Sequence, residues 1–318
     1  MTEVAASTHS SALRQADLDQ LQLTSVGADR GASSREMLAA IIASSVLRLA
    51  EQVPLLPHGI DSEAVHQARV ATRRLRSDLR TFRTLFSEEW AERLRAELSW
   101  LAELLGQVRD ADVLFDRMIA SLAEIEGSPT GRRVVLQQLT ARRERARAQM
   151  LKGLVTARYA ALLRALVDAA RSPVLSGPAD EPAGEALPRF AVTPWKKLHR
   201  AVGRLGENPS DDDLHAVRIA AKRARYAAEA VAPLVGSAAR RYAAAVGELQ
   251  GALGDYHDSV VARQWLAEIT PGLRRGGPFY TVALAERERA RGVDALGQWE
   301  DAWKRASRPR LRAWMTDD

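Results

Sequence analysis

A helical pattern in residues 65–86 recurs 149 positions later, and this repeat constrains the fold more than any other feature of the sequence. In the first copy, small and apolar side chains step by three and four, which predicts a helix with one buried face. A cationic stripe lies about 120° round the same helix. The buried stripe comprises Val65, Ala68, Thr72, Leu75, Leu79 and Phe82, and the cationic stripe comprises His66, Arg69, Arg73, Arg76 and Arg80.

The second copy keeps the histidine and most of the cations in register. Its segment from Leu214 to Arg225 aligns with Val65 to Arg76 without a gap. Glu229 stands where the first copy has Arg80, so the second cationic stripe is one turn shorter. A helix repeated in register at this distance indicates a duplicated unit. The cationic positions of the second copy are His215, Arg218, Lys222 and Arg225.

A second motif follows the first in both halves, at an offset of 148. LGQVRDADV, from Leu105, matches LGDYHDSVV, from Leu253, so that Arg109 corresponds to His257. Within each motif the glycine is expected to end one helix, and in the first half Asp110 can cap the next. We interpret Asp110 and its counterpart Asp258 as helix caps or as partners that orient arginines, in preference to catalytic acids.

The periodicity predicts an all-α protein, with about ten helices and no credible alternating strand. Two matched motifs in the same order favour two antiparallel four-helix bundles related by a pseudo-two-fold, with their basic faces together. Residues 1–33 lack sustained periodicity and are expected to form a disordered tail. The predicted bundles are residues 34–171 and 194–318, joined by a proline-rich linker at 172–193.

Charge and composition limit which kinds of partner and which cellular compartment are expected. The 46 Lys and Arg exceed the 40 Asp and Glu, and the pI near 9.9 favours an anionic partner. The absence of cysteine excludes thiolate catalysis and Cys-ligated zinc. No apolar run reaches the roughly 18 residues of a membrane span, and the first residues lack a signal-peptide pattern. We therefore expect a soluble, cytoplasmic protein without a membrane partner.

The two copies, HQARVATRRLRSDL and LHAVRIAAKRARYAAE, each followed by LG-x-x-x-D, resemble the CHAD family, the α-helical domain named for its recurring histidines. The resemblance spans roughly residues 34–315. It implies two four-helix bundles whose histidines and basic side chains line a pore or groove that binds inorganic polyphosphate. It also implies association with polyphosphate granules, where granule proteins are further candidate partners. Some members carry an N-terminal triphosphatase (CYTH) domain with an ExExK strand, which this sequence does not contain.

The candidate binding residues are those that repeat at helical spacing. Arginine offers forked, permanently charged donors to phosphate oxygens, and lysine offers a point charge. Histidine adds a donor whose charge depends on pH, so binding is expected to strengthen on acidification. We predict no catalytic residue, metal ligand or cofactor. The predicted polyphosphate ligands are His66, Arg69, Arg73, Arg76, His215, Arg218, Lys222 and Arg225, with Arg80, Arg109, Lys197, Arg200, Arg204 and His257 as additional candidates.

Several other interpretations stay open at this point. A basic helical face is often simply solvated, and the two repeated histidines could be hydrogen-bonded within the core. Low-specificity nucleic-acid binding is the main alternative, although aromatic residues are only 5% of the chain and none interrupts the first His/Arg stripe. The His257–Asp258 pair is found in metal-dependent phosphohydrolases, but Arg109 at the equivalent position would repel a metal ion. No Gly-Lys pair exists, so a phosphate loop of the GxxxxGK type is absent.

Overall fold

The computed structural model describes residues 22, 31–58, 62–177 and 179–315, and every regular element within them is a helix. This confirms the predicted all-α class. Nearly all of the predicted tail, residues 1–33, lies outside the described residues. The first half contains α3 (Ser34–Gln52), α4 (Ser62–Thr81), α5 (Glu88–Ala123), α6 (Pro129–Leu154) and α7 (Ala157–Arg171), with 3-10 turns η1 (Leu56–His58) and η2 (Arg83–Leu85).

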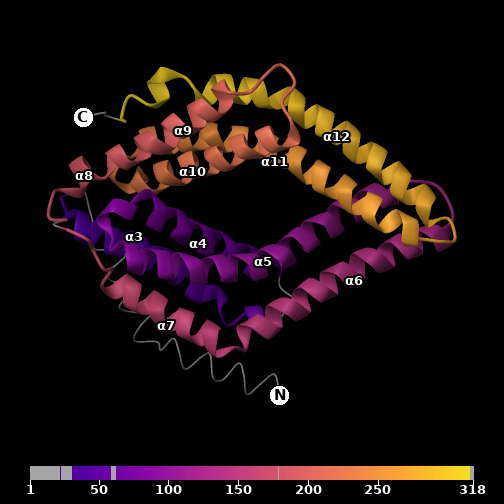
Figure 1. Ribbon diagram of the computed structural model, residues 1–318, viewed down its shortest axis with the longest axis horizontal. Coiled ribbons are helices and arrows are strands. Elements are labelled where there is room, and N and C mark those ends of the chain that lie inside the picture. The colour runs from indigo at the N-terminus through magenta and orange to yellow at the C-terminus, as the bar shows by residue number, and fades with distance from the viewer. Residues whose placement is uncertain (1–21, 23–30, 59–61, 178, 316–318) are drawn as a thin grey trace.

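The second half forms a layer of long helices above the first (Figure 1). The hairpins α5–α6 and α11–α12 extend from the body of the molecule and meet at their far ends, where they share a small hydrophobic core. The elements are α8 (Ala183–Ala186), α9 (Val192–Gly203), α10 (Asp211–Val235), α11 (Ser237–Ile269) and α12 (Gly277–Ala306), with 3-10 turns η3 (Pro188–Ala191), η4 (Thr270–Gly272) and η5 (Pro309–Leu311).

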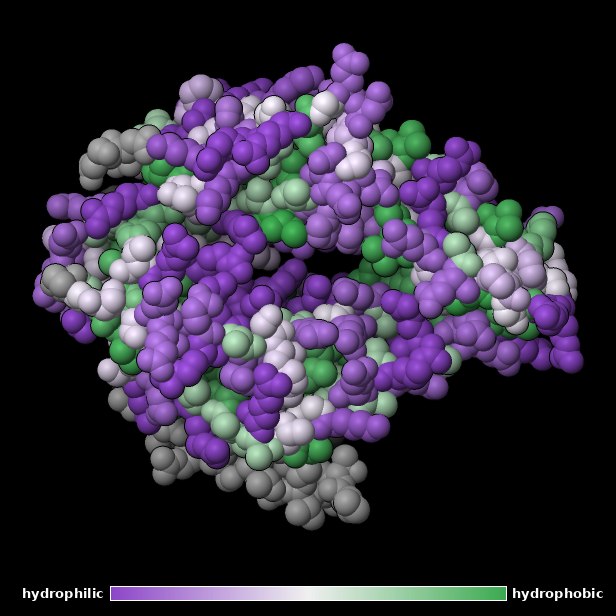
Figure 2. Space-filling view, in the orientation of Figure 1, coloured by the Kyte–Doolittle hydropathy of each residue, from purple (hydrophilic) through white to green (hydrophobic). Residues whose placement is uncertain are grey.

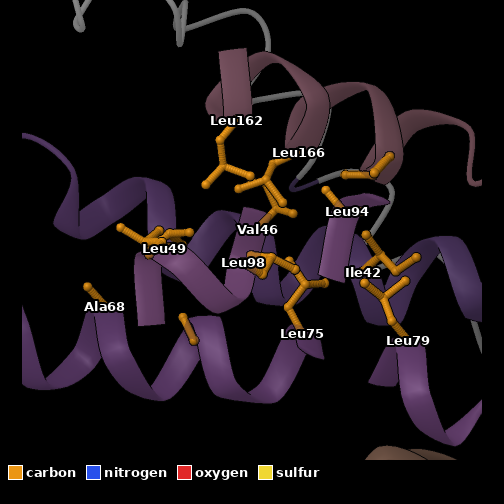
Figure 3. Close-up of a cluster of buried hydrophobic side chains, with 14 of the residues drawn as sticks. Ile42, Val46, Leu49, Ala68, Leu75, Leu79, Leu94, Leu98, Leu162 and Leu166 are labelled. Atoms are coloured by element: carbon orange, nitrogen blue, oxygen red, sulfur yellow. The ribbon is translucent and has the colours of Figure 1, made fainter. Parts of the chain in front are cut away.

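The predicted apolar stripe is buried in both copies of the repeat. In the first copy, the five predicted positions on α4 and Phe82 just after it are at most 2% exposed, and the stripe packs against α3, α5 and α7 (Figure 3). The six positions 149 residues later, on α10, are equally buried. The sequence repeat is therefore matched by a repeat in burial, whereas the pseudo-two-fold itself stays a prediction. The buried positions of α10 are Leu214, Val217, Ala221, Ala224, Ala228 and Val231.

The largest core draws on both halves of the chain. It is built mainly from α3, α4, α5 and α7, and it also takes in Ala227, Val231 and Leu234 of α10. The segment 172–193, predicted as a linker, contains α8 and η3 and contributes Ala183 and Leu187 to the same core. Because α10 packs against α4 and shares this core, cations of the two helices lie close enough to act on one another.

Two predicted helix ends are wrong. We expected Gly106 to end a helix that Asp110 would restart, and Gly254 to separate two helices, but α5 and α11 run unbroken through these residues. A glycine inside a helix costs only about 1 kcal/mol, which is small beside the apolar burial on either side of it. Each glycine instead lies under an arginine: an added Cβ would be 3.6 Å from Arg69 Nε at Gly106 and 3.7 Å from Arg218 Nε at Gly254.

The last two helices of the first half are separated by a short break. The structure ends α6 at Leu154 and starts α7 at Ala157, because the Thr156 side chain accepts a hydrogen bond from the Tyr159 backbone N–H. A side-chain cap of this kind satisfies a donor that would otherwise be orphaned at the first turn. In the core of the second half, Trp195 stacks on Trp303 at 5.7 Å.

Replacing Leu75 with alanine tests whether the apolar stripe holds α4 in place. Leu75 is fully buried, so Leu75→Ala should lower the free energy of unfolding by about 2–5 kcal/mol. Leu55 is 43% exposed, and Leu55→Ala is the matched control, with a change below about 1 kcal/mol. Urea denaturation followed by circular dichroism measures both. Equal losses for the two variants would contradict the assignment of the stripe to the core.

Candidate anion-binding site

The cations predicted from the repeat meet where α4 lies against α10. Arg69 and Arg73 of α4 and Arg218 and Lys222 of α10 form one group of half-buried side chains, here called the central cluster. The pKa of Lys222 is lowered to about 8. Burial is the largest cause, and the nearby charges of Arg218, Arg73 and Arg69 add to it. The pKa values of Arg69 and Arg218 are also lowered, first by burial and then by the cations around them.

Two carboxylates partly offset this repulsion. Arg69 Nη2 donates to Asp110 Oδ1 at 3.3 Å, and Asp258 is the first of the charges that favour the cationic form of Arg218. Asp110 and its repeat counterpart thus act as partners of arginines, as one of the two sequence interpretations held, and neither caps a helix. Arg73 and Lys222 have no ion-pair partner within the described part of the chain. The central cluster holds four cations against two carboxylates.

The cluster also leaves hydrogen-bonding capacity unused. The Nε atoms of Arg73 and Arg218 are buried and have no hydrogen-bond partner among the described residues. The large majority of buried polar side-chain atoms in proteins have a hydrogen-bond partner, so each exception needs an explanation. A multivalent anion on the outer edge of the guanidinium groups would supply both the missing charge and acceptors.

The histidines border the central cluster, one from each copy. Burial lowers the pKa of His66, the charge of Arg109 lowers it further, and its Nδ1 is buried without a partner among the described residues. His215 Nδ1 lies 3.3 Å from His257 Nδ1, and burial, Arg218 and His215 together lower the pKa of His257 to about 4. Arg109 and His257 therefore lie beside the site, each next to the histidine of its own half.

A cavity of about 620 Å³ opens beside the cluster and contains part of the predicted set. His66, Arg73 and Arg225 line it. Arg225 is bound to Glu229 at 2.7 Å, and Glu229 also contacts Arg74 across the helix interface at 3.4 Å. The acid that replaces the last cation of the second stripe therefore links α10 to α4.

The stripe of α4 is divided between two places. Arg76 and Arg80 lie away from the central cluster: burial and Arg95 lower the pKa of Arg76, and burial and then Arg223 lower that of Arg80. Arg80 lines a second cavity, and Lys197 of α9 lines it as well. The remaining two candidates are exposed. Arg200 of α9 borders a shallow hollow beside Trp195, and Arg204 is the residue directly after α9.

Sequence reasoning missed several residues that line these cavities. Tyr226, Arg240 and Gln250 join the first cavity, and Arg95 and Arg189 join the second. None of them repeats in the other half with the same chemistry, so the internal comparison gave no signal for them. Their placement depends on which helices pack together, and that was not available from helical spacing.

Figure 2 shows the molecule hollowed between its two layers of helices, with hydrophilic side chains around the hollow. Within the described ranges, no group of three or more His, Cys, Asp and Glu side chains is arranged to hold a metal ion. In the same part of the chain, no helix combines the length and the apolar character needed to cross a membrane.

Comparison with known sequences identifies relatives. A family model described as the CHAD domain matches residues 40–267. An uncharacterized protein of Mycobacterium tuberculosis is 32% identical over 212 residues, which are 65% of this chain and 40% of that protein. A protein from a second strain of the same species matches to the same extent. The match thus spans less than half the length of these curated relatives.

Solved structures share the fold. PptA from Streptomyces chartreusis has a TM-score of 0.73 at 21% identity, with 86% of this chain and 100% of that chain covered. The CHAD domain from the plant Ricinus communis has a TM-score of 0.63 at 24% identity, with 92% and 94% covered. At these identities the likeness concerns the helical architecture.

The crowding of the central cluster should be visible in the titration of Lys222. Its ammonium is expected to lose a proton near pH 8, well below the usual lysine value of 10.5, because it is buried beside Arg218. NMR of reductively ¹³C-methylated protein measures this pKa, with the signal assigned by its loss in Lys222→Arg. Arg218→Ala should move the midpoint upward. A midpoint near 10.5 in the unchanged protein would show that the cluster is not crowded.

Proposed function

The chain belongs to the CHAD domain family, and we propose that it binds inorganic polyphosphate at the central cluster without hydrolysing it. The observation that carries this proposal is the set of four half-buried cations that α4 and α10 hold together against two carboxylates. Partly desolvated like charges are unfavourable until an anion neutralises them. The ligand is therefore expected to be strongly anionic.

The donor set suits a polyphosphate chain. Such a chain carries about one negative charge per internal phosphate and has no base to be stacked or read, so closely spaced donors are sufficient. Arg69, Arg73 and Arg218 provide forked donors, and Lys222 provides a compact charge between them. His66 and His215 lie at the border, where a bound anion would favour their protonated forms. Affinity is thus expected to rise as pH falls.

Granule association is a further part of the proposal. The family resemblance supports it, because it implies a place on polyphosphate granules and contact with granule proteins. No individual residue carries this part of the proposal. We expect the cytoplasm to be the compartment, because the known setting of such granules is the cell interior.

Nucleic acid is the competing ligand, because its backbone would satisfy the same donors. Single-stranded nucleic acid is usually held by aromatic side chains as well as by charge. Tyr226 is the aromatic residue among those that line the cavity beside the cluster, and Arg225 lies 6.0 Å from its ring centroid. One aromatic ring beside four cations favours a ligand that is recognised by charge alone.

Removing two central arginines tests the site. Arg73→Ala/Arg218→Ala should weaken binding of long-chain polyphosphate by at least about tenfold, since a single charge-assisted hydrogen bond is worth roughly 1.5–3 kcal/mol. The control is Arg93→Ala/Arg289→Ala, which removes the same charge from side chains that are 73% and 65% exposed. Fluorescence anisotropy gives the affinities, and circular dichroism checks the fold. Equal affinities for the two double variants would refute the site.

The pH dependence of binding tests the role of Lys222. Anion binding favours the ammonium form, so affinity should fall as pH rises above 8, by at most about tenfold per pH unit for uptake of one proton. Lys222→Arg keeps its charge throughout this range. Its affinity should therefore be nearly constant from pH 7 to 9.5. The same alkaline loss in both proteins would mean that Lys222 does not contact the anion.

A competition titration separates the alternatives. Long polyphosphate and duplex DNA of equal total charge are compared at several salt concentrations, because counterion release weakens both. We expect polyphosphate to displace DNA at every salt concentration. Preference for DNA would support the nucleic-acid alternative. Release of free phosphate with Mg²⁺ or Mn²⁺ would instead support a hydrolase.

A further inference from the structure

The second cavity lies beside the other end of the α4 stripe and contains no residue of the central cluster. Its volume is about 800 Å³, within the range of about 300–1,000 Å³ that is usual for small-molecule sites. It is here called the lateral pocket. It is lined by the end of α4 and by η2, α5, η3, α9 and α10, so both halves of the chain contribute to its walls.

The lining of the lateral pocket is strongly cationic. Seven of its sixteen residues are lysine or arginine, and no carboxylate is among the described residues that line it. Two of these cations have acidic partners outside the lining, Glu92 on Arg95 and Glu181 on Arg189, whose side chains are 59% and 67% exposed. The cations come from six elements: Arg80, Arg83, Arg95, Arg189, Lys196, Lys197 and Arg223.

The positive charges in the pocket act on one another. Burial lowers the pKa of Arg80, and Arg223, Arg95 and Arg76 lower it further, while Glu92 opposes them more weakly. The arrangement resembles that of the central cluster, in which helices hold like charges together. Four hydroxyl side chains in the same lining, Ser77, Thr81, Thr84 and Thr193, add neutral donors for phosphate oxygens.

One wall of the pocket is apolar. Phe190 is half-buried, packs edge-on against Phe82 at 5.4 Å, and lies in the lining beside Val192 and Pro194. A bare phosphate chain offers nothing to such a wall, whereas a small molecule with both a phosphate group and an apolar or aromatic part can use it. The apolar wall distinguishes the lateral pocket from an open basic track.

We propose that the lateral pocket is a separate binding site for a small molecule that carries an oligophosphate group. Arg95 of α5 and Arg223 of α10 both lie near Arg80 and, together with it, bind the phosphates. Arg80 follows Arg73 by seven residues, which is about 10 Å along α4, so a compact anion in the pocket leaves the central cluster uncovered. The site goes beyond long-chain polyphosphate binding and does not depend on it.

The test uses tripolyphosphate and ATP as probes, which share the triphosphate group and differ in the nucleoside. Isothermal titration of the full chain with the central substitutions Arg73→Ala/Arg218→Ala should retain one site for tripolyphosphate. Adding Arg95→Ala/Arg223→Ala should weaken that site at least tenfold. Adding Arg93→Ala/Arg289→Ala, which removes the same charge from exposed side chains outside the pocket, should leave it unchanged.

Two results would overturn the proposal: no tripolyphosphate binding once the central cluster is removed, or equal affinity in the pocket and control variants. If the combined variant does not fold, Arg95→Ala/Arg223→Ala alone is measured, and its stoichiometry should fall from two sites to one. Tighter binding of ATP upholds the site and assigns the apolar wall to the nucleoside, whereas tighter binding of tripolyphosphate upholds it with an inorganic ligand. Loss of long-chain binding through the central substitutions reports on the proposed function alone.

Discussion

Repulsion between like charges is the interaction on which the arrangement of this protein depends. Arg69, Arg73, Arg218 and Lys222 are held half-buried with two carboxylates nearby, and such a group would separate if the chain were free to move. The opposing force is the burial of apolar side chains directly beneath them. The five buried stripe positions on α4 and the six on α10 belong to the same helices as the cations. Each helix therefore carries both the repulsion and the burial that offsets it.

The duplicated sequence explains why two helices, α4 and α10, are enough to hold the cations together. A single amphipathic helix with one basic face can turn that face to solvent and lose the crowding. When a second helix with the same pattern packs beside it and shares its core, both basic faces are confined to one interface. The unbroken α5 and α11 complete the arrangement, since Arg69 packs over Gly106 of α5 and Arg218 packs over Gly254 of α11. The repeat in sequence has thus become a repeat in contacts.

Much of this could be predicted from helical spacing, because burial and periodicity express the same geometry. The buried stripe from Val65 to Phe82 was predicted correctly to the residue, and the positions 149 residues later are buried as well. The helix ends at Gly106 and Gly254 were predicted wrongly, because a local breaker signal was given more weight than the apolar pattern that continues on both sides. Arg95 and Phe190 could not be found at all, since they reach the lateral pocket from elements whose packing is set by distant residues.

The carboxylates that already contact the site have a consequence for which anions can enter it. Asp110 on Arg69, and Glu229 between Arg74 and Arg225, are tethered competitors with effective concentrations in the millimolar range or above. A lone phosphate ion that displaces one of them exchanges one contact for another and gains little. A polyphosphate chain that displaces several carboxylates pays the entropy of binding once and gains a contact at each cation. At the anion site proposed above, the tethered acids therefore favour an anion that carries many charges over monomeric phosphate.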